Sequence, residues 1–146
     1  MQDKLSPIDR RILRLLQHNA DLSAAEVAEK VELSQSPCWR RIHRMQEDGL
    51  IERKVALLNH KRLGFGITVF VDIKLSAHGR GNLDEFERAV VGYPQVLECH
   101  TMAGGSDYLL KVVAKDIADY ERFLRDHLLQ RPHVHEAHSH IAMSEL

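Results

Sequence analysis

Three arginines lie close together in a stretch of the chain where no acidic residue occurs between Ser34 and Gln46. Arg40, Arg41 and Arg44 each carry a guanidinium group that can donate paired hydrogen bonds to guanine O6 and N7, or bind a phosphate. Three arginines on a helix can also be no more than a charged face exposed to solvent. The surrounding residues decide between these interpretations, and they favour contact with DNA.

The segment that carries the arginines, residues 22–49, has the signals of two short helices in tandem. Ser23, with a Glu three residues later, forms a capping box at the start of the first helix. Ser34 and Ser36 each offer a cap for the second helix, and Pro37 suits its first turn. Gly49 is well suited to end it. Two helices joined by so tight a turn predict a helix-turn-helix, whose second helix enters the DNA major groove.

The second helix sorts its residues by type around its axis. At about 100° per residue, Cys38, Ile42 and Met45 fall on one side and are expected to pack inward. Trp39 has two interpretations that are equally supported. Its ring either contacts DNA or covers the small helical core. The predicted DNA-binding residues are Gln35, Ser36, Trp39, Arg40, His43 and Arg44.

The flanking residues complete an N-terminal module. Ser6 and Pro7 look like a cap and first position of an earlier helix, which makes three helices before Gly49. Residues 50–58 are predicted to form one or two short strands, as in the wing of a winged helix-turn-helix. Arg53 and Lys54 would then lie near a phosphate backbone. A plain connecting strand with a solvated basic pair is the equal alternative.

The remaining chain has the pattern of a second, α+β domain. Apolar residues alternate over 67–75 as in a half-buried strand, and Asn82 and Asp116 are candidate caps of two helices. With further strands predicted at 96–102, 108–114 and 134–143, the order is βαββαβ, a ferredoxin-like unit. Its sheet has one face under two helices and the other open to water or a partner subunit. The predicted domains are residues 1–58 (helix-turn-helix), 59–66 (linker) and 67–146 (the α+β domain).

The overall composition restricts the classes of protein. The net charge of −1 gives no global attraction to DNA, so a DNA-binding protein of this kind needs dimerisation to gather phosphate contacts. No apolar run approaches about 18 residues, the length of a membrane span, and the N-terminus lacks a signal-peptide core. A cytoplasmic protein with two reduced thiols is expected. We find no recognisable catalytic motif and expect no enzyme and no cofactor.

At the level of motifs, the chain resembles the Lrp/AsnC, or feast/famine, transcriptional regulators over almost its whole length. In the first half the resemblance rests on Asp9 to Leu13, on Leu22-Ser23 with Ala28, and on residues 36–42 followed by 47–51. In the second half it rests on residues 102–110. The Ser-Pro-Cys-Trp-Arg-Arg run is similar to one subgroup of the family, some of whose members respond to sulfur amino acids.

This resemblance implies a small effector, usually an amino acid, bound by the second domain, and assembly into homodimers, tetramers or octamers on double-stranded DNA. The matching effector-binding residues are Met102, Ala103, Gly104, Gly105, Ser106 and Asp107. A glycine-rich turn exposes N–H groups to a carboxylate, and Asp107 would pair with an ammonium group. The same residues also suit an ordinary hairpin turn.

Histidines supply a competing prediction. Of the 10 histidines, five crowd the C-terminal part of the chain. If the last strand is regular, His133 and His135 share one of its faces, and His138 and His140 share the other. A metal-responsive DNA-binding regulator is therefore the alternative function, although spacing alone does not make ligands converge and no cysteine accompanies them.

Overall fold

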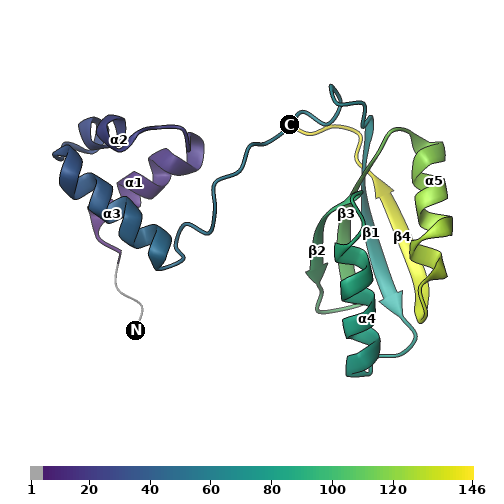
Figure 1. Ribbon diagram of the computed structural model, residues 1–146. Helices are drawn as coiled ribbons and strands as arrows, with labels where there is room; N and C mark the ends of the chain where they lie inside the picture. The colour runs from purple at the N-terminus through teal and green to yellow at the C-terminus, as the bar shows by residue number, and fades with distance from the viewer. Residues whose placement is uncertain (1–4) are drawn as a thin grey trace. The chain divides into compact units, whose positions relative to one another are not determined.

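The computed structural model describes residues 5–146 and divides into two compact units, one ending at Leu57 and the other beginning at Leu58 (Figure 1). Each unit has its own apolar core, so each is described separately. The fold predicted from the sequence, a helix-turn-helix domain followed by a ferredoxin-like α+β domain, is confirmed. None of the described helices is both long and apolar enough to cross a membrane.

The N-terminal unit contains α1 (Pro7–His18), α2 (Ala24–Val31) and α3 (Gln35–Glu47). The predicted caps at the first two helices are present. Ser6 accepts the N–H of Asp9 with Pro7 at the first helical position, and Ser23 and Glu26 form both bonds of the capping box. The buried side chains come from all three helices, and they are Ile12, Leu16, Val27, Ala28, Val31, Cys38, Ile42 and Met45.

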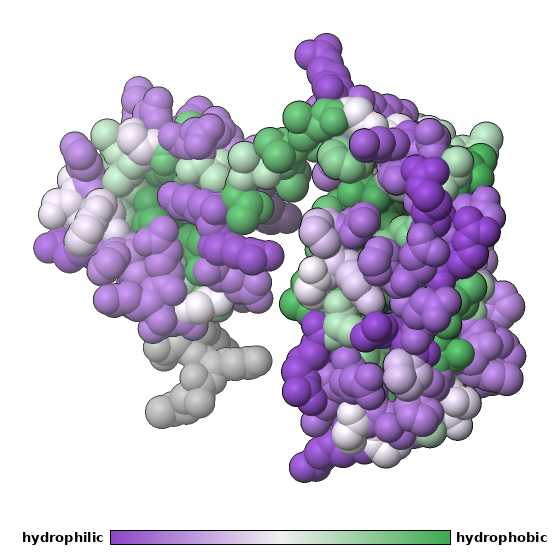
Figure 2. Space-filling model, turned by 45° about the vertical axis from the view of Figure 1, so that its right-hand side comes forward, coloured by the Kyte–Doolittle hydropathy of each residue, from purple (hydrophilic) through white to green (hydrophobic). Residues whose placement is uncertain are grey.

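The chain leaves α3 through Gly49, whose φ of 73° is a left-handed conformation that glycine adopts at little cost. The prediction of strands in residues 50–58 is wrong, because this stretch is extended but forms no ladder. Within it, only the N–H of Ile51 bonds back to the helical unit, at Met45. Val55, Leu57 and Leu58 are exposed, and the connecting segment shows apolar surface in Figure 2. A strand needs a hydrogen-bonded neighbour, and no strand of the sheet pairs with residues 50–58.

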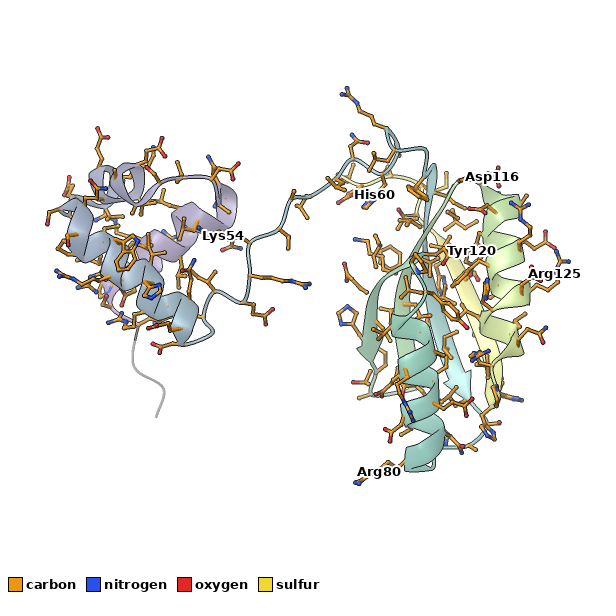
Figure 3. All side chains as sticks on the ribbon, viewed as in Figure 1. Lys54, His60, Arg80, Asp116, Tyr120 and Arg125 are labelled. Atoms are coloured by element: carbon orange, nitrogen blue, oxygen red, sulfur yellow. The ribbon has the colours of Figure 1, made fainter. Side chains whose placement is uncertain are left out.

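The C-terminal unit is a four-stranded antiparallel sheet in the order β2-β3-β1-β4 with two long helices. Its elements are β1 (Ile67–Leu75), α4 (Arg80–Val91), β2 (Val96–Thr101), β3 (Tyr108–Ala114), α5 (Ile117–Asp126), the short 3-10 helix η1 (Leu128–Gln130) and β4 (Val134–Ile141). Side chains of α4 and α5 pack on alternate residues of the central strands, including Val69, Val71 and Ile73. In Figure 3, Tyr120 points from α5 toward the sheet, where its hydroxyl bonds Ser139, and Arg125 points away.

Two local expectations in this unit are wrong. Helix α4 begins at Arg80 rather than after Asn82, because the carbonyl of the extended Gly79 already accepts the N–H groups of Asn82 and Leu83. The second error concerns β4, where a register shift opposite Lys74 and Leu75 leaves His133 outside the strand with a φ of 68°. His133 and His135 therefore do not share a regular strand face.

The sheet face opposite the two helices is called the open face below. It is formed by the residues of each strand that alternate with the core residues. Two rows cross it, and the pairing registers give them as His138–Asp72–Leu109–His100 and His140–Phe70–Lys111–Glu98. His138 and His140 thus share a face, as the alternation of a regular strand requires.

Candidate DNA-reading helix and effector turn

The outer face of α3 is built from polar side chains and is exposed. Ser36, Arg40, His43 and Glu47 lie opposite the buried Cys38, Ile42 and Met45. Within residues 5–146, Arg40 takes part in no ion pair and no side-chain hydrogen bond, so its guanidinium donors are available to a ligand. This geometry is compatible with base reading in a major groove.

One flank of this face is an aromatic stack. The rings of Trp39 and His43 lie 4.9 Å apart at an interplanar angle of 15°, and His43 Nε2 is 3.3 Å from a carboxylate oxygen of Glu47. Trp39 is 55% exposed. Trp39 therefore does not cover the helical core as one of the two interpretations expected, and part of its ring is exposed.

The other flank is an ion-pair cluster that joins α3 to α1. Arg41 Nη1 is 3.0 Å from one carboxylate oxygen of Asp9, and Arg44 Nη2 is 2.8 Å from the other. Burial alone would raise the pKa of Asp9, but hydrogen bonding by Ser6 and Arg41 and the charge of Arg44 outweigh it and lower the pKa. Sequence reasoning treated Asp9 only as part of a motif, because no local pattern pairs it with residues more than thirty positions away.

The start of α3 is open to a ligand. Ser34 occupies the N-cap, but its side chain makes no cap hydrogen bond. The N–H groups of the first turn, around Gln35 and Ser36, therefore have no side-chain acceptor there. A helix N-terminus of this kind attracts anions such as DNA phosphates.

The predicted effector residues form the turn between β2 and β3. The N–H of Met102 donates to the carbonyl of Asp107 at 2.8 Å and closes the turn. Residues 102–105 are exposed, and Gly104 has a φ of 127°. Among the described residues, none accepts a backbone hydrogen bond from the N–H groups of positions 103–106. These groups are free to bind a carboxylate.

Asp107 is tied to neighbouring segments through its carboxylate. One oxygen accepts the N–H of Leu75 at 2.7 Å, and both lie 3.1 Å from His78 Nε2. The Leu75 bond, followed by the His78 contacts, outweighs desolvation and holds the pKa of Asp107 below its usual range. Ser106 donates to Asp72 at 3.0 Å. Tyr108, which follows Asp107 in the sequence, is buried, and its hydroxyl donates to Glu87.

A cavity lies elsewhere in this unit. It measures about 450 Å³ and is lined by the linker after Leu58, the start of β1 and the C-terminal residues 142–145. The turn lies near the other end of β1, since Asp107 bonds Ile73 and Leu75. The turn, unlike this cavity, brings free backbone N–H groups next to a carboxylate whose pKa is lowered.

A histidine metal site finds no support in the structure. Among residues 5–146, no group of three or more His, Cys, Asp or Glu side chains is arranged to hold a metal ion. His138 and His140 instead contact Glu136 and Asp72 at 3.1 and 3.2 Å. The metal-responsive alternative is not carried further.

The fold and the exposed helix define the class, a helix-turn-helix DNA-binding protein with a separate ligand-binding domain. Residues 5–52 match the family of winged helix-turn-helix DNA-binding domains, and residues 68–146 match the Lrp/AsnC ligand binding domain. The chain belongs to the Lrp/AsnC family of transcriptional regulators.

Individual relatives agree with this assignment. An AsnC family transcriptional regulator from Agrobacterium tumefaciens is 41% identical with a TM-score of 0.89, over 97% of this chain and 92% of that one. A transcriptional regulator of Neisseria meningitidis, solved in complex with L-Met, is 31% identical with a TM-score of 0.92 and the same coverage. The glutamate uptake regulatory protein of Zymomonas mobilis is 41% identical over 98% of this chain and 87% of its own length. All three are named as regulators.

Proposed function

We propose that this regulator binds double-stranded DNA through α3 and changes its DNA binding or assembly when an amino acid occupies the turn at Met102–Asp107. The DNA contacts are Gln35, Ser36, Trp39, Arg40, His43 and Arg44. The protein acts in the cytoplasm as a homodimer or a larger even assembly. We also propose that it is a member of the subgroup with the Ser-Pro-Cys-Trp-Arg-Arg run, which this chain carries in α3.

The observation that carries the effector proposal is the pairing of opposite binding groups within one turn. The free N–H groups at positions 103–106 suit a carboxylate, and the ionised Asp107 suits an ammonium group. A free amino acid presents both groups a few ångströms apart. The L-Met complex of the Neisseria meningitidis relative supports the same ligand class.

A thermal-shift screen against the twenty amino acids tests this proposal. A ligand that binds only the folded chain raises the free energy of unfolding by about 2.7 kcal/mol when present at 100 times its Kd, and the unfolding midpoint rises with it. We expect a shift with one or a few amino acids, and we expect Asp107→Asn to abolish it. Common divalent metals, included in the same screen, are expected to give no comparable shift.

Asp119→Asn is the matched control for this experiment. Asp119 lies in the same unit, also accepts a backbone N–H, from Lys115 at 2.9 Å, and also has a pKa lowered chiefly by that bond. Its substitution should alter stability without altering the amino-acid response. A response that survives Asp107→Asn, or one lost equally in Asp119→Asn, would contradict the proposed site.

A further inference from the structure

We infer that Asp9, a residue of α1, is the positioning residue that fixes how Arg44 is presented to DNA and that withholds part of the charge of Arg44 and Arg41 from the phosphates. The inference rests on the proposed DNA contacts of α3. It assigns a DNA-binding role to a side chain that is 4% exposed and that would itself touch no base or phosphate.

The first support is the geometry of the cluster. Each oxygen of the Asp9 carboxylate receives one guanidinium, from Arg41 at 3.0 Å and from Arg44 at 2.8 Å. Arg41 also lies 3.4 Å from the Ser6 hydroxyl, which caps α1. A buried carboxylate that lost these donors would be left without compensation, so the cluster holds both arginines in place.

The second support is the unequal exposure of the two arginines. The Arg44 side chain is 53% exposed and that of Arg41 is 32% exposed. Arg44 therefore donates one N–H group to Asp9, and the rest of its guanidinium remains exposed at the edge of the outer face of α3. A guanidinium already held in one orientation loses less conformational freedom when it binds a base edge.

The third support is the charge of the cluster and the space beside it. One carboxylate shared by two guanidiniums leaves a net charge of about one for the pair, whereas Arg40 keeps its full charge. A hollow of about 280 Å³, lined in part by Asp9, Arg41, Arg44 and Asp48, adjoins the cluster. If Asp9 were neutral, the arginines would have both the charge and the room to reach phosphates of any sequence.

The test is Asp9→Asn in the full chain, measured by equilibrium DNA titration. One duplex is selected from random sequence by the wild-type protein, and the other is an unrelated duplex of equal length. For Asp9→Asn we expect tighter binding to the unrelated duplex and a slope of log K against log salt that is steeper by about 0.9 per chain, the value for one added phosphate contact. The preference for the selected duplex should fall about tenfold, within the range attributed to one arginine–base pair.

Ser6→Ala separates positioning from simple destabilisation. It removes the hydroxyl that caps the same helix and adjoins the same cluster, without changing any charge. We expect it to lower stability while leaving the salt slope unchanged. If Ser6→Ala moved the slope as Asp9→Asn does, the effect would be structural and the inference would be overturned.

Arg44→Gln supplies the second test, which stands even if Asp9→Asn does not fold. Because Asp9 holds one end of the Arg44 guanidinium, wild-type Arg44 should make no full phosphate contact on the unrelated duplex, and Arg44→Gln should change the slope there by less than about 0.5. A change of about 0.9 would overturn the inference. In the Arg44→Gln background, Asp9→Asn should have less than half of its effect, and a full effect would also overturn it. A wild-type chain that selects no sequence would instead overturn the proposed DNA contacts themselves.

Discussion

Three arginines within five positions of one helix have different surroundings, although they look alike in the sequence. Arg41 and Arg44 are held by Asp9, and Arg40 is unpaired within the described residues. Arg40 also lies nearest the centre of the outer face of α3. Its donors are therefore the ones most available for sequence-specific contact.

Arg40→Ala should weaken binding to the selected duplex by about 1–3 kcal/mol if Arg40 reads a base edge. The loss on an unrelated duplex should be much smaller. Titration of both duplexes at fixed salt measures the two losses. Arg53→Ala serves as the control, because Arg53 lies in the extended segment outside any helix and should affect both duplexes alike. Equal losses for Arg40→Ala would mean a phosphate contact instead.

At the scale of elements, the two helices of the reading motif begin differently. At the start of α2, the Ser23 hydroxyl accepts the N–H of Glu26, and the Glu26 carboxylate accepts the N–H of Ser23. Ser34 at the start of α3 makes no such bond, although its backbone has the extended conformation of a cap. The start of α2 thus has two capping bonds, and the start of α3 has no side-chain cap.

Ser23→Ala should lower the free energy of unfolding of the N-terminal unit by about 0.5–2 kcal/mol, the usual range for a lost cap. Ser34→Ala, the matched control, should lower it by less because no cap bond is lost. Urea denaturation followed by the fluorescence of Trp39, the one tryptophan of the chain, reports on this unit. A loss for Ser34→Ala equal to that for Ser23→Ala would show that the Ser34 side chain caps α3 in solution.

At the scale of the whole molecule, the open face leaves apolar surface between charged pairs. Phe70 and Leu109 lie in adjacent rows of this face, flanked by Asp72 and Lys111. With a net charge of −1, a single chain has little general attraction to DNA. Assembly would bring two reading helices onto one duplex and double the phosphate contacts.

We therefore expect the protein to sediment as at least a dimer, and Phe70→Glu to shift it toward the monomer by placing an unpaired charge in the interface. The control is Leu129→Glu, because Leu129 is 49% exposed, similar to the 37% of Phe70, but lies on η1 rather than on the open face. Sedimentation velocity distinguishes the species. A Phe70→Glu variant that stays dimeric would show that subunits meet through another surface.

Local patterns were sufficient for much of this fold. Capping residues, apolar spacing and strand alternation are set by neighbours within a few positions, and they placed α1 to α3 and the four strands close to their observed ends. Two of the wrong predictions depend on distant partners, whereas the start of α4 is set locally by the Gly79 carbonyl. Residues 50–58 have no strand to pair with, and the bulge opposite Lys74 and Leu75 removed His133 from β4.

The sequence by itself determined the helix-turn-helix, the βαββαβ order, the family resemblance and the set of side chains on α3. Each of these depends on residues that are close together in the sequence. The tertiary structure decided which of those side chains are free. Asp9 holds Arg41 and Arg44 from another helix, and Asp107 is shared with Leu75 and His78 from the end of β1 and the loop after it. Such pairs are brought together only by packing, so the charge available to DNA or to an effector is a property of the folded chain.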